Sequence, residues 1–169
     1  RIDEKHGFYV DFYRSDNAIS NDYLYHNIGD SVALYTQDGK VLKQDEVLSY
    51  PCVGEDHPGL RYFRSVRTTG RNESTVVALF SAKLLNTGTS YMKMWMPASS
   101  DVSYFTALAP SAKTASSPYQ SKPSLVVTMR KEKPAVEEPF VVVYEPISDK
   151  LSTGLIESVD RIKLDSLGK

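Results

Sequence analysis

Several residue types that build common sites are scarce in this chain. Its 169 residues include one cysteine, one tryptophan and three histidines. The single cysteine, Cys52, excludes an intramolecular disulfide and any zinc site made of cysteine pairs, and we interpret it as a small, partly buried apolar residue. Glu55, Asp56 and His57 are adjacent, and three adjacent residues rarely converge on one ion. We therefore predict no metal site and no cofactor.

An excess of charge and long apolar runs are also missing. The formal net charge is -1 at pH 7, so no overall field would hold the chain on a nucleic acid or an anionic membrane. No apolar run approaches the roughly 20 residues that a membrane-spanning helix needs. The sequence has no glycine-rich phosphate-binding loop and no G-x-S-x-G elbow. We predict neither a nucleic-acid nor a membrane partner.

What the chain does have is side-chain alternation with a period of two. Eleven tyrosines favour pleated, half-buried surfaces. In residues 8–13, phenylalanine and valine fall on one face, with Tyr9, Asp11 and Tyr13 on the other. Asp38-Gly39 predicts a tight hairpin turn in which both central residues have positive φ. Glu145-Pro146 is expected to end a strand, and residues 43–49 could form one or two helical turns. The expected strands are 8–12, 31–36, 40–43, 60–66, 75–82, 90–96, 102–108, 124–129, 140–144 and 155–162.

Short strands at close intervals, separated by turn signals, predict an all-β fold with little helix. We expect an antiparallel β-sandwich, either jelly-roll-like or made of two sheets, that forms a single domain over residues 1–169. The polar segment 111–123 is rich in serine, lysine, alanine and proline and is expected to be a loop or linker.

Residues 90–96 form the most informative strand, because its two faces differ. The methionines at 92, 94 and 96 share one face, which we predict to lie in the core. Tyr91, Lys93 and Trp95 share the other face. Either a second sheet or a domain interface covers them, or they form a platform on which sugar rings stack while Lys93 pairs with an acidic sugar.

Residues 22–30 hold the densest cluster of groups that could do chemistry. On a strand, Tyr23 and Tyr25 face one way and His26 faces the other. We interpret His26 as a structural, hydrogen-bonded histidine, with a role as acid or base as the alternative. Arg61, Arg64 and Arg67 do not share a face on a strand, so we expect them to be solvated or ion-paired.

Two stretches resemble the heparinase II/III-like polysaccharide lyases. The first is Phe8-Tyr-Val-Asp-Phe-Tyr-Arg14 followed by Asn21-Asp-Tyr-Leu-Tyr-His-Asn27. The second runs from Met92-Lys-Met-Trp-Met-Pro97 through residues 104–110 and 124–130 to Pro139-Phe-Val-Val-Val-Tyr-Glu-Pro146. It is similar to the late part of those enzymes, where a strand ending in Met-Pro precedes an aromatic strand and a Phe-Val-x-Val-x-Glu-Pro strand.

The resemblance implies a parent enzyme with an α-helical toroid and β-sandwich domains that cleaves acidic polysaccharides by β-elimination. It also implies a periplasmic or secreted bacterial protein. No position here matches the catalytic residues of that family, so we expect a non-catalytic C-terminal fragment whose partners are the N-terminal catalytic domains and, through substrate binding, an acidic polysaccharide. A free-standing carbohydrate-binding module and a lyase-active fragment remain the alternatives. The residues expected to contact sugar or a neighbouring domain are Arg14, Tyr23, Tyr25, Tyr91, Lys93 and Trp95.

Overall fold

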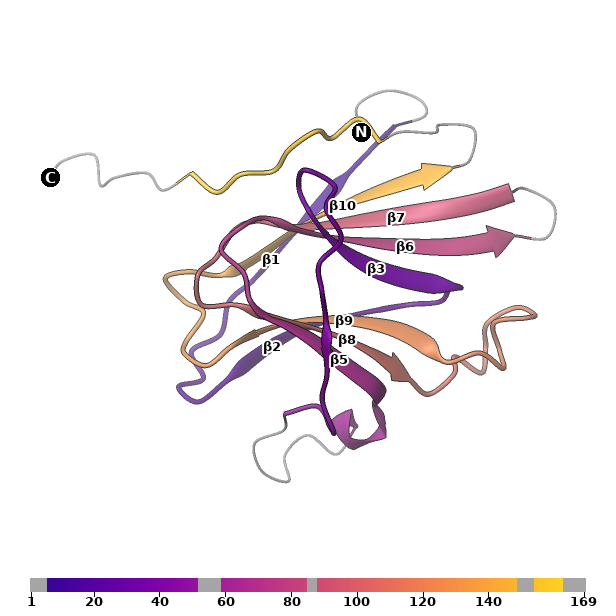
Figure 1. Cartoon of the computed structure of the whole chain (residues 1–169), viewed down its shortest axis with the longest axis horizontal. Coiled ribbons are helices and arrows are strands. Elements are labelled where there is room, and N and C mark those ends of the chain that lie inside the picture. Colours follow the sequence, from indigo (N-terminus) through magenta and orange to yellow (C-terminus); the bar gives the residue numbers. More distant parts are fainter. Residues whose placement is uncertain (1–5, 52–58, 85–87, 149–153, 163–169) are drawn as a thin grey trace, which may run out of the picture.

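The computed structural model describes residues 6–51, 59–84, 88–148 and 154–162, with no side-chain description for Leu84. Two five-stranded antiparallel sheets lie face to face (Figure 1). The first has the order β1-β10-β7-β6-β3 and the second β2-β9-β8-β5-β4. The strands are β1 (Tyr9–Tyr13), β2 (Asn21–Asn27), β3 (Ser31–Thr36), β4 (Asp45–Glu46), β5 (Arg64–Arg71), β6 (Val76–Leu84), β7 (Gly88–Met96), β8 (Ser103–Ala109), β9 (Ser124–Lys131) and β10 (Phe140–Ser148), with one short 3-10 helix, η1 (Leu60–Tyr62).

The main core lies between the two sheets. Alternate residues of each strand point inward, as the period of two requires. The predicted methionine face is part of this core: Met94 and Met96 are fully buried, and Met92 packs against them at the margin. The all-β sandwich prediction is confirmed, and the described residues contain no α-helix.

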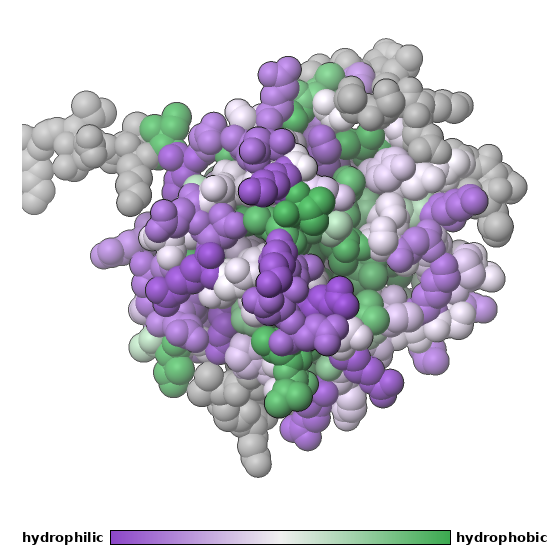
Figure 2. Space-filling view, in the orientation of Figure 1, coloured by the Kyte–Doolittle hydropathy of each residue, from purple (hydrophilic) through white to green (hydrophobic). Residues whose placement is uncertain are grey.

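Each sheet also carries a smaller apolar cluster on its outer face. On the second sheet, Tyr50 and Phe63 cover Val66 and Phe105. On the first sheet, the C-terminal segment 154–162, yellow in Figure 1, runs across the outer face and covers Trp95. On the side seen in Figure 2, hydrophobic residues form limited groups among hydrophilic ones. Each outer face is therefore covered in part, by irregular chain rather than by a third sheet.

The two sheets meet at two edges. At one edge, β1 of the first sheet lies beside β2 of the second; at the other edge, β3 is followed by the crossing to β4. Gly29 lies where the chain passes from β2 to β3, and a Cβ there would be 2.6 Å from the carbonyl oxygen of Ser81. Only glycine fits this close approach, which fixes the path between the sheets.

Several local predictions were wrong. Residues 155–162 form no strand, because their backbone groups bond to the side chains of Glu145, Gln37 and Thr75 and not to a sheet edge. Residues 43–49 contain the short strand β4 and no helical turn. The strand expected at 60–66 begins only at Arg64, after η1, and extends to Arg71.

Two further predictions, one of a strand end and one of a turn, also need correction. The strand expected to stop at Tyr144 continues through Pro146 to Ser148, since β1 pairs with β10 only up to Tyr144 and requires no N–H from the proline. At the hairpin after β3, only Gly39 has positive φ, at 84°. Its N–H bonds to the Thr36 carbonyl, and the Thr36 N–H bonds to the Lys40 carbonyl. This is a type I turn followed by a left-handed residue, not the mirror-image turn.

Candidate functional site

The face of β7 that carries Tyr91, Lys93 and Trp95 lies outward, as the alternation predicts. Trp95 is only 3% exposed, because Ile156 and Val159 of the C-terminal segment pack on it. The Lys93 ammonium lies 5.3 Å from the centre of the Trp95 ring. The indole is thus covered by the chain itself, and it presents no open platform to a sugar in this conformation.

The carboxylate of Glu145 holds the covering segment in place. Its Oε1 accepts the backbone N–H groups of Leu155 at 2.6 Å and Ile156 at 2.9 Å, and its Oε2 accepts the indole N–H of Trp95 at 3.4 Å. Gly154 lies directly against this carboxylate, since a Cβ there would come within 2.6 Å of Oε1. The sequence signal for this residue is a lone acid on the otherwise apolar outer face of β10.

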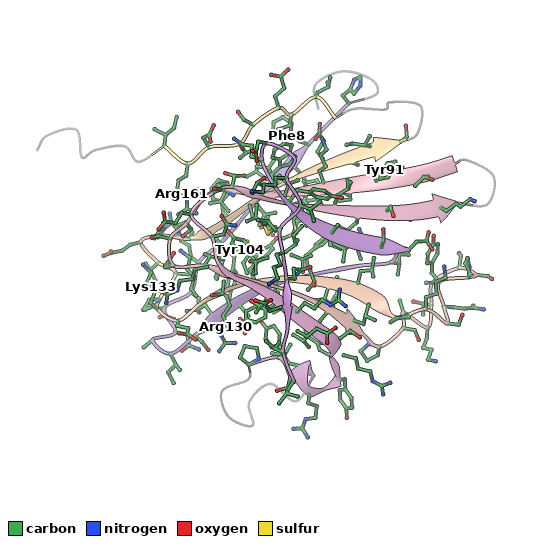
Figure 3. All side chains as sticks on the ribbon, in the orientation of Figure 1. Phe8, Tyr91, Tyr104, Arg130, Lys133 and Arg161 are labelled. Atoms are coloured by element: carbon green, nitrogen blue, oxygen red, sulfur yellow. The ribbon has the colours of Figure 1, made fainter. Side chains whose placement is uncertain are left out.

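A cluster of charges ties the end of the same segment to the loop between β9 and β10. Arg161 lies 2.9 Å from Glu138. The fully buried ammonium of Lys131 lies 3.4 Å from Asp101 and donates to the Glu138 carbonyl at 2.7 Å. Lys133 completes the cluster at 2.7 Å from Asp101, and Figure 3 shows Lys133 and Arg161 at the same end of the sandwich. Since buried charges must be paired, this cluster is structural.

Acid should weaken the cluster through Asp101. Burial would raise the pKa of this carboxyl, but hydrogen bonds from Lys133 and Ser99 outweigh burial and lower the pKa from 3.8 to about 2. Because the folded-state pKa is below the unfolded one, the stabilisation is present above about pH 4 and is lost as the pH falls toward 2. Asp101→Asn should flatten the pH dependence of the free energy of unfolding in that window. Urea denaturation at a series of pH values measures this, and Asp45→Asn, at an exposed surface pair, should leave the slope as it is.

Tyr23 and Tyr25 belong to a cluster of four tyrosines between β1, β2 and β10. The Tyr9 and Tyr144 rings stack at 4.5 Å, and the Tyr25 ring lies 4.8 Å from that of Tyr144. The Tyr23 hydroxyl donates to Asp11 at 2.6 Å and lies 2.8 Å from the Tyr144 hydroxyl. The sequence placed Tyr23 and Tyr25 on one face but gave no sign that residues from β1 and β10 join them.

The ionisation of these phenols argues against proton abstraction by the cluster. Burial is the main cause that raises the pKa of Tyr9, Tyr23 and Tyr144, and it raises the pKa of Tyr25 to about 12. Phenols with raised pKa values stay protonated near neutral pH, whereas a general base must be deprotonated. The rings pack together where β1 meets β2.

His26 lies on the opposite face of β2 from these tyrosines, as predicted. Its ring meets Phe63 edge to face at 5.9 Å, and burial lowers the pKa of the imidazole. The sheet thus separates His26 from Tyr25, and the two groups do not form an acid–base pair in one site.

In the described part of the chain, no group of three or more histidine, cysteine or acidic side chains could hold a metal ion. Cys52 and the triplet at 55–57 lie outside the described residues.

Strand β1 is an exposed apolar edge strand. All five of its residues are exposed, and Phe12 reaches 66%. Phe8, labelled in Figure 3, precedes the strand and continues the same outward row with Val10 and Phe12. Arg14 is exposed at its end. Among the described residues, the outer edge of β1 has no partner strand. We call Phe8, Val10 and Phe12 the β1 apolar row.

Tyr91 borders a hollow at the end of the sandwich opposite Arg161 (Figure 3). The hollow has a volume of about 430 Å³, and its walls include Ile28, Phe80, Met92 and Ile147. The lining is mixed, because it also includes the polar residues Asn27, Ser81, Ser90, Tyr91 and Ser148. In the described ranges, no helix is long and apolar enough to cross a bilayer.

These features define an all-β sandwich domain with a self-covered outer face and an exposed apolar edge strand. Over an alignment of 152 residues that covers 86% of this chain, it is 36% identical to an endo-acting ulvan lyase of Formosa agariphila. The chain is thus a relative of part of a polysaccharide lyase, and the matched stretch spans 18% of that protein. No protein-family profile matches the chain, and no solved structure matches it.

Proposed function

We propose that this chain is an accessory β-sandwich domain of a larger polysaccharide lyase, and that the parent enzyme acts on ulvan. Its role is to support the catalytic domains of the same polypeptide through the β1 apolar row and to contribute to substrate binding. The choice of substrate follows the name of the relative, of which this chain matches only 18%.

The exposed edge strand carries this proposal. An unpaired edge with apolar side chains invites association, so proteins that keep one usually cover it with a partner or another part of the chain. Phe8, Val10 and Phe12 form a row that the C-terminal segment leaves exposed. At about 25 cal/mol per Å² of apolar surface, burying about 300 Å² there would contribute roughly 7 kcal/mol before ordering costs.

An accessory role requires no acid–base pair, and His26 lies across the sheet from Tyr23 and Tyr25. We also propose two narrower points. The parent enzyme is heparinase II/III-like, because of the motifs in residues 8–27 and 92–146, and it is periplasmic or secreted.

The test uses this chain and the remainder of its parent polypeptide, produced separately. Phe12→Asp should weaken their association at least about tenfold, because a charge would be buried in an apolar contact. Val41→Asp is the matched control, since Val41 is 64% exposed and lies beyond β3 at the opposite edge. Equal loss in both variants, or no association of the unaltered pieces, would exclude docking through β1.

Activity measurements test the other half of the proposal. The parent enzyme should release unsaturated uronate from ulvan, seen by its ultraviolet absorbance, and this chain alone should release none. Release by the isolated chain would establish the lyase-active alternative instead.

A further inference from the structure

A second surface, far along the chain from the β1 apolar row, has the composition of an anion-binding sugar site. A pocket of about 530 Å³ lies where η1 and the start of β5 meet the end of β8 and the segment 110–123. Figure 1 shows η1 at the bottom of the molecule. This volume is in the range of small-molecule sites. Its lining combines an aromatic ring, two cations, several hydroxyls and an apolar base.

The two cations are Arg64 and Lys113. Both are exposed, both line the pocket, and no acidic residue is found among its described lining. The nearby Arg67 is different, because it pairs with Glu46 at 3.1 Å. An arginine and a lysine that line one pocket without a carboxylate suit an anion such as a carboxylate or a sulfate group.

The ring is that of Tyr62, which is 62% exposed. Tyrosine faces accept the C–H faces of sugar rings, and the hydroxyls of Ser65 and Ser121 can bond to sugar hydroxyls. The apolar base comes from Leu108 and Pro110. The same pocket therefore offers stacking, hydrogen bonding and charge within one volume.

The backbone at Ser65 is arranged for this site. Its φ is 50°, in the left-handed region that serine rarely adopts, and the β5–β8 register shifts between Arg64 and Arg67. Such bulges re-aim side chains and are enriched beside binding sites. Here the bulge separates Arg64, which lines the pocket, from Arg67, which pairs with Glu46 on β4.

We infer that this pocket binds an acidic sugar unit, with Tyr62 stacked on the ring and Arg64 and Lys113 holding its carboxylate or sulfate. The inference rests on the proposed function only for the choice of ulvan as probe. The pocket shares no residue with the β1 apolar row, so sugar binding and domain docking can fail independently.

Titration calorimetry of the whole chain tests the inference with ulvan oligosaccharides, a neutral glucan oligosaccharide and sodium sulfate. Ulvan fragments should bind, added salt should weaken the binding, and the glucan should give no heat. Sulfate alone should bind much more weakly than the oligosaccharide, because it cannot stack on Tyr62. Binding of sulfate as tight as that of the oligosaccharide, or absence of ulvan binding, would overturn the assignment.

Variants separate the pocket from the general charge of the surface. Arg64→Gln, Lys113→Gln and Tyr62→Ala should each weaken binding by about tenfold. Arg61→Gln removes the same charge from η1 outside the pocket lining and should change affinity less than about twofold. All four side chains are exposed, so the fold should be retained, which circular dichroism checks. An equal loss for Arg61→Gln and Arg64→Gln would reduce the effect to non-specific attraction and contradict the site.

Discussion

Arg130→Met should lower the free energy of unfolding by about 3 kcal/mol, as expected when one partner of a buried ion pair is removed. Arg130 on β9 is the register partner of Asp22 on β2, and its guanidinium lies 3.2 Å from that carboxylate. The two side chains are only 5% and 12% exposed. The substitution leaves the carboxylate at a low-dielectric position without its cation, so the cost is mainly that of the charge left behind.

Neighbouring groups bond to both members of this ion pair. The Tyr50 hydroxyl donates to Asp22 at 2.9 Å, and the Arg130 guanidinium lies 6.0 Å from the centre of the Tyr50 ring. Arg130 also donates to the carbonyl of Pro51. Because Tyr50 covers the apolar cluster on the outer face of this sheet, loss of Arg130 should also loosen that cover.

Arg67→Met is the matched control, since it removes the same charge from an exposed pair. Arg67 and Glu46 are 52% and 80% exposed, and a surface pair of this kind contributes less than about 1 kcal/mol. Urea denaturation of both variants measures the difference. Asp22→Asn combined with Arg130→Met should recover part of the loss, because it removes the unpaired charge. Similar losses for Arg67→Met and Arg130→Met would show that the buried pair contributes no more to the free energy of unfolding than the exposed pair.

The sequence predicted the strands well because alternation is a local property. The methionines of β7 and the opposite faces of Tyr25 and His26 followed from counting residues in steps of two. The same count placed Phe8, Val10 and Phe12 on one face of β1, but it did not predict that this face is exposed. A strand's face is set by its immediate neighbours in the chain, and no knowledge of the partner strands is needed.

What covers each face could not be predicted in this way. Residues 155–162 have the alternation of a strand, yet they lie across a sheet face because the side chains of Glu145 and Gln37 take their N–H groups. Glu145 looked like the end of a strand, since Pro146 follows it. The pocket beside Arg64 depends on a bulge, and a bulge reverses the alternation that the prediction used.

Glu145→Ala should release the C-terminal segment from the sheet and expose Trp95 to water. The substitution removes the acceptor for the N–H groups of Leu155, Ile156 and the indole. Hydrogen bonds to a charged group contribute about 1.5–3 kcal/mol each, so the segment should lose more than about 3 kcal/mol of attachment. The chain has one tryptophan, so its fluorescence reports this face alone. Emission should shift to longer wavelength, and quenching by acrylamide should increase.

A second variant and a control make this result specific. Gly154→Ala keeps the carboxylate but places a Cβ within 2.6 Å of Oε1, so the Glu145 side chain must shift and Trp95 should be exposed less than in Glu145→Ala. Glu157→Ala removes an exposed carboxylate from the same segment and should leave the emission unchanged. Because the segment is held by side chains and not by a strand ladder, it should open at a lower free energy than the sheet beneath it. The amides of Leu155 and Ile156 should then exchange with solvent faster than those of β7, and equal rates, together with unshifted emission in Glu145→Ala, would contradict the role given to Glu145.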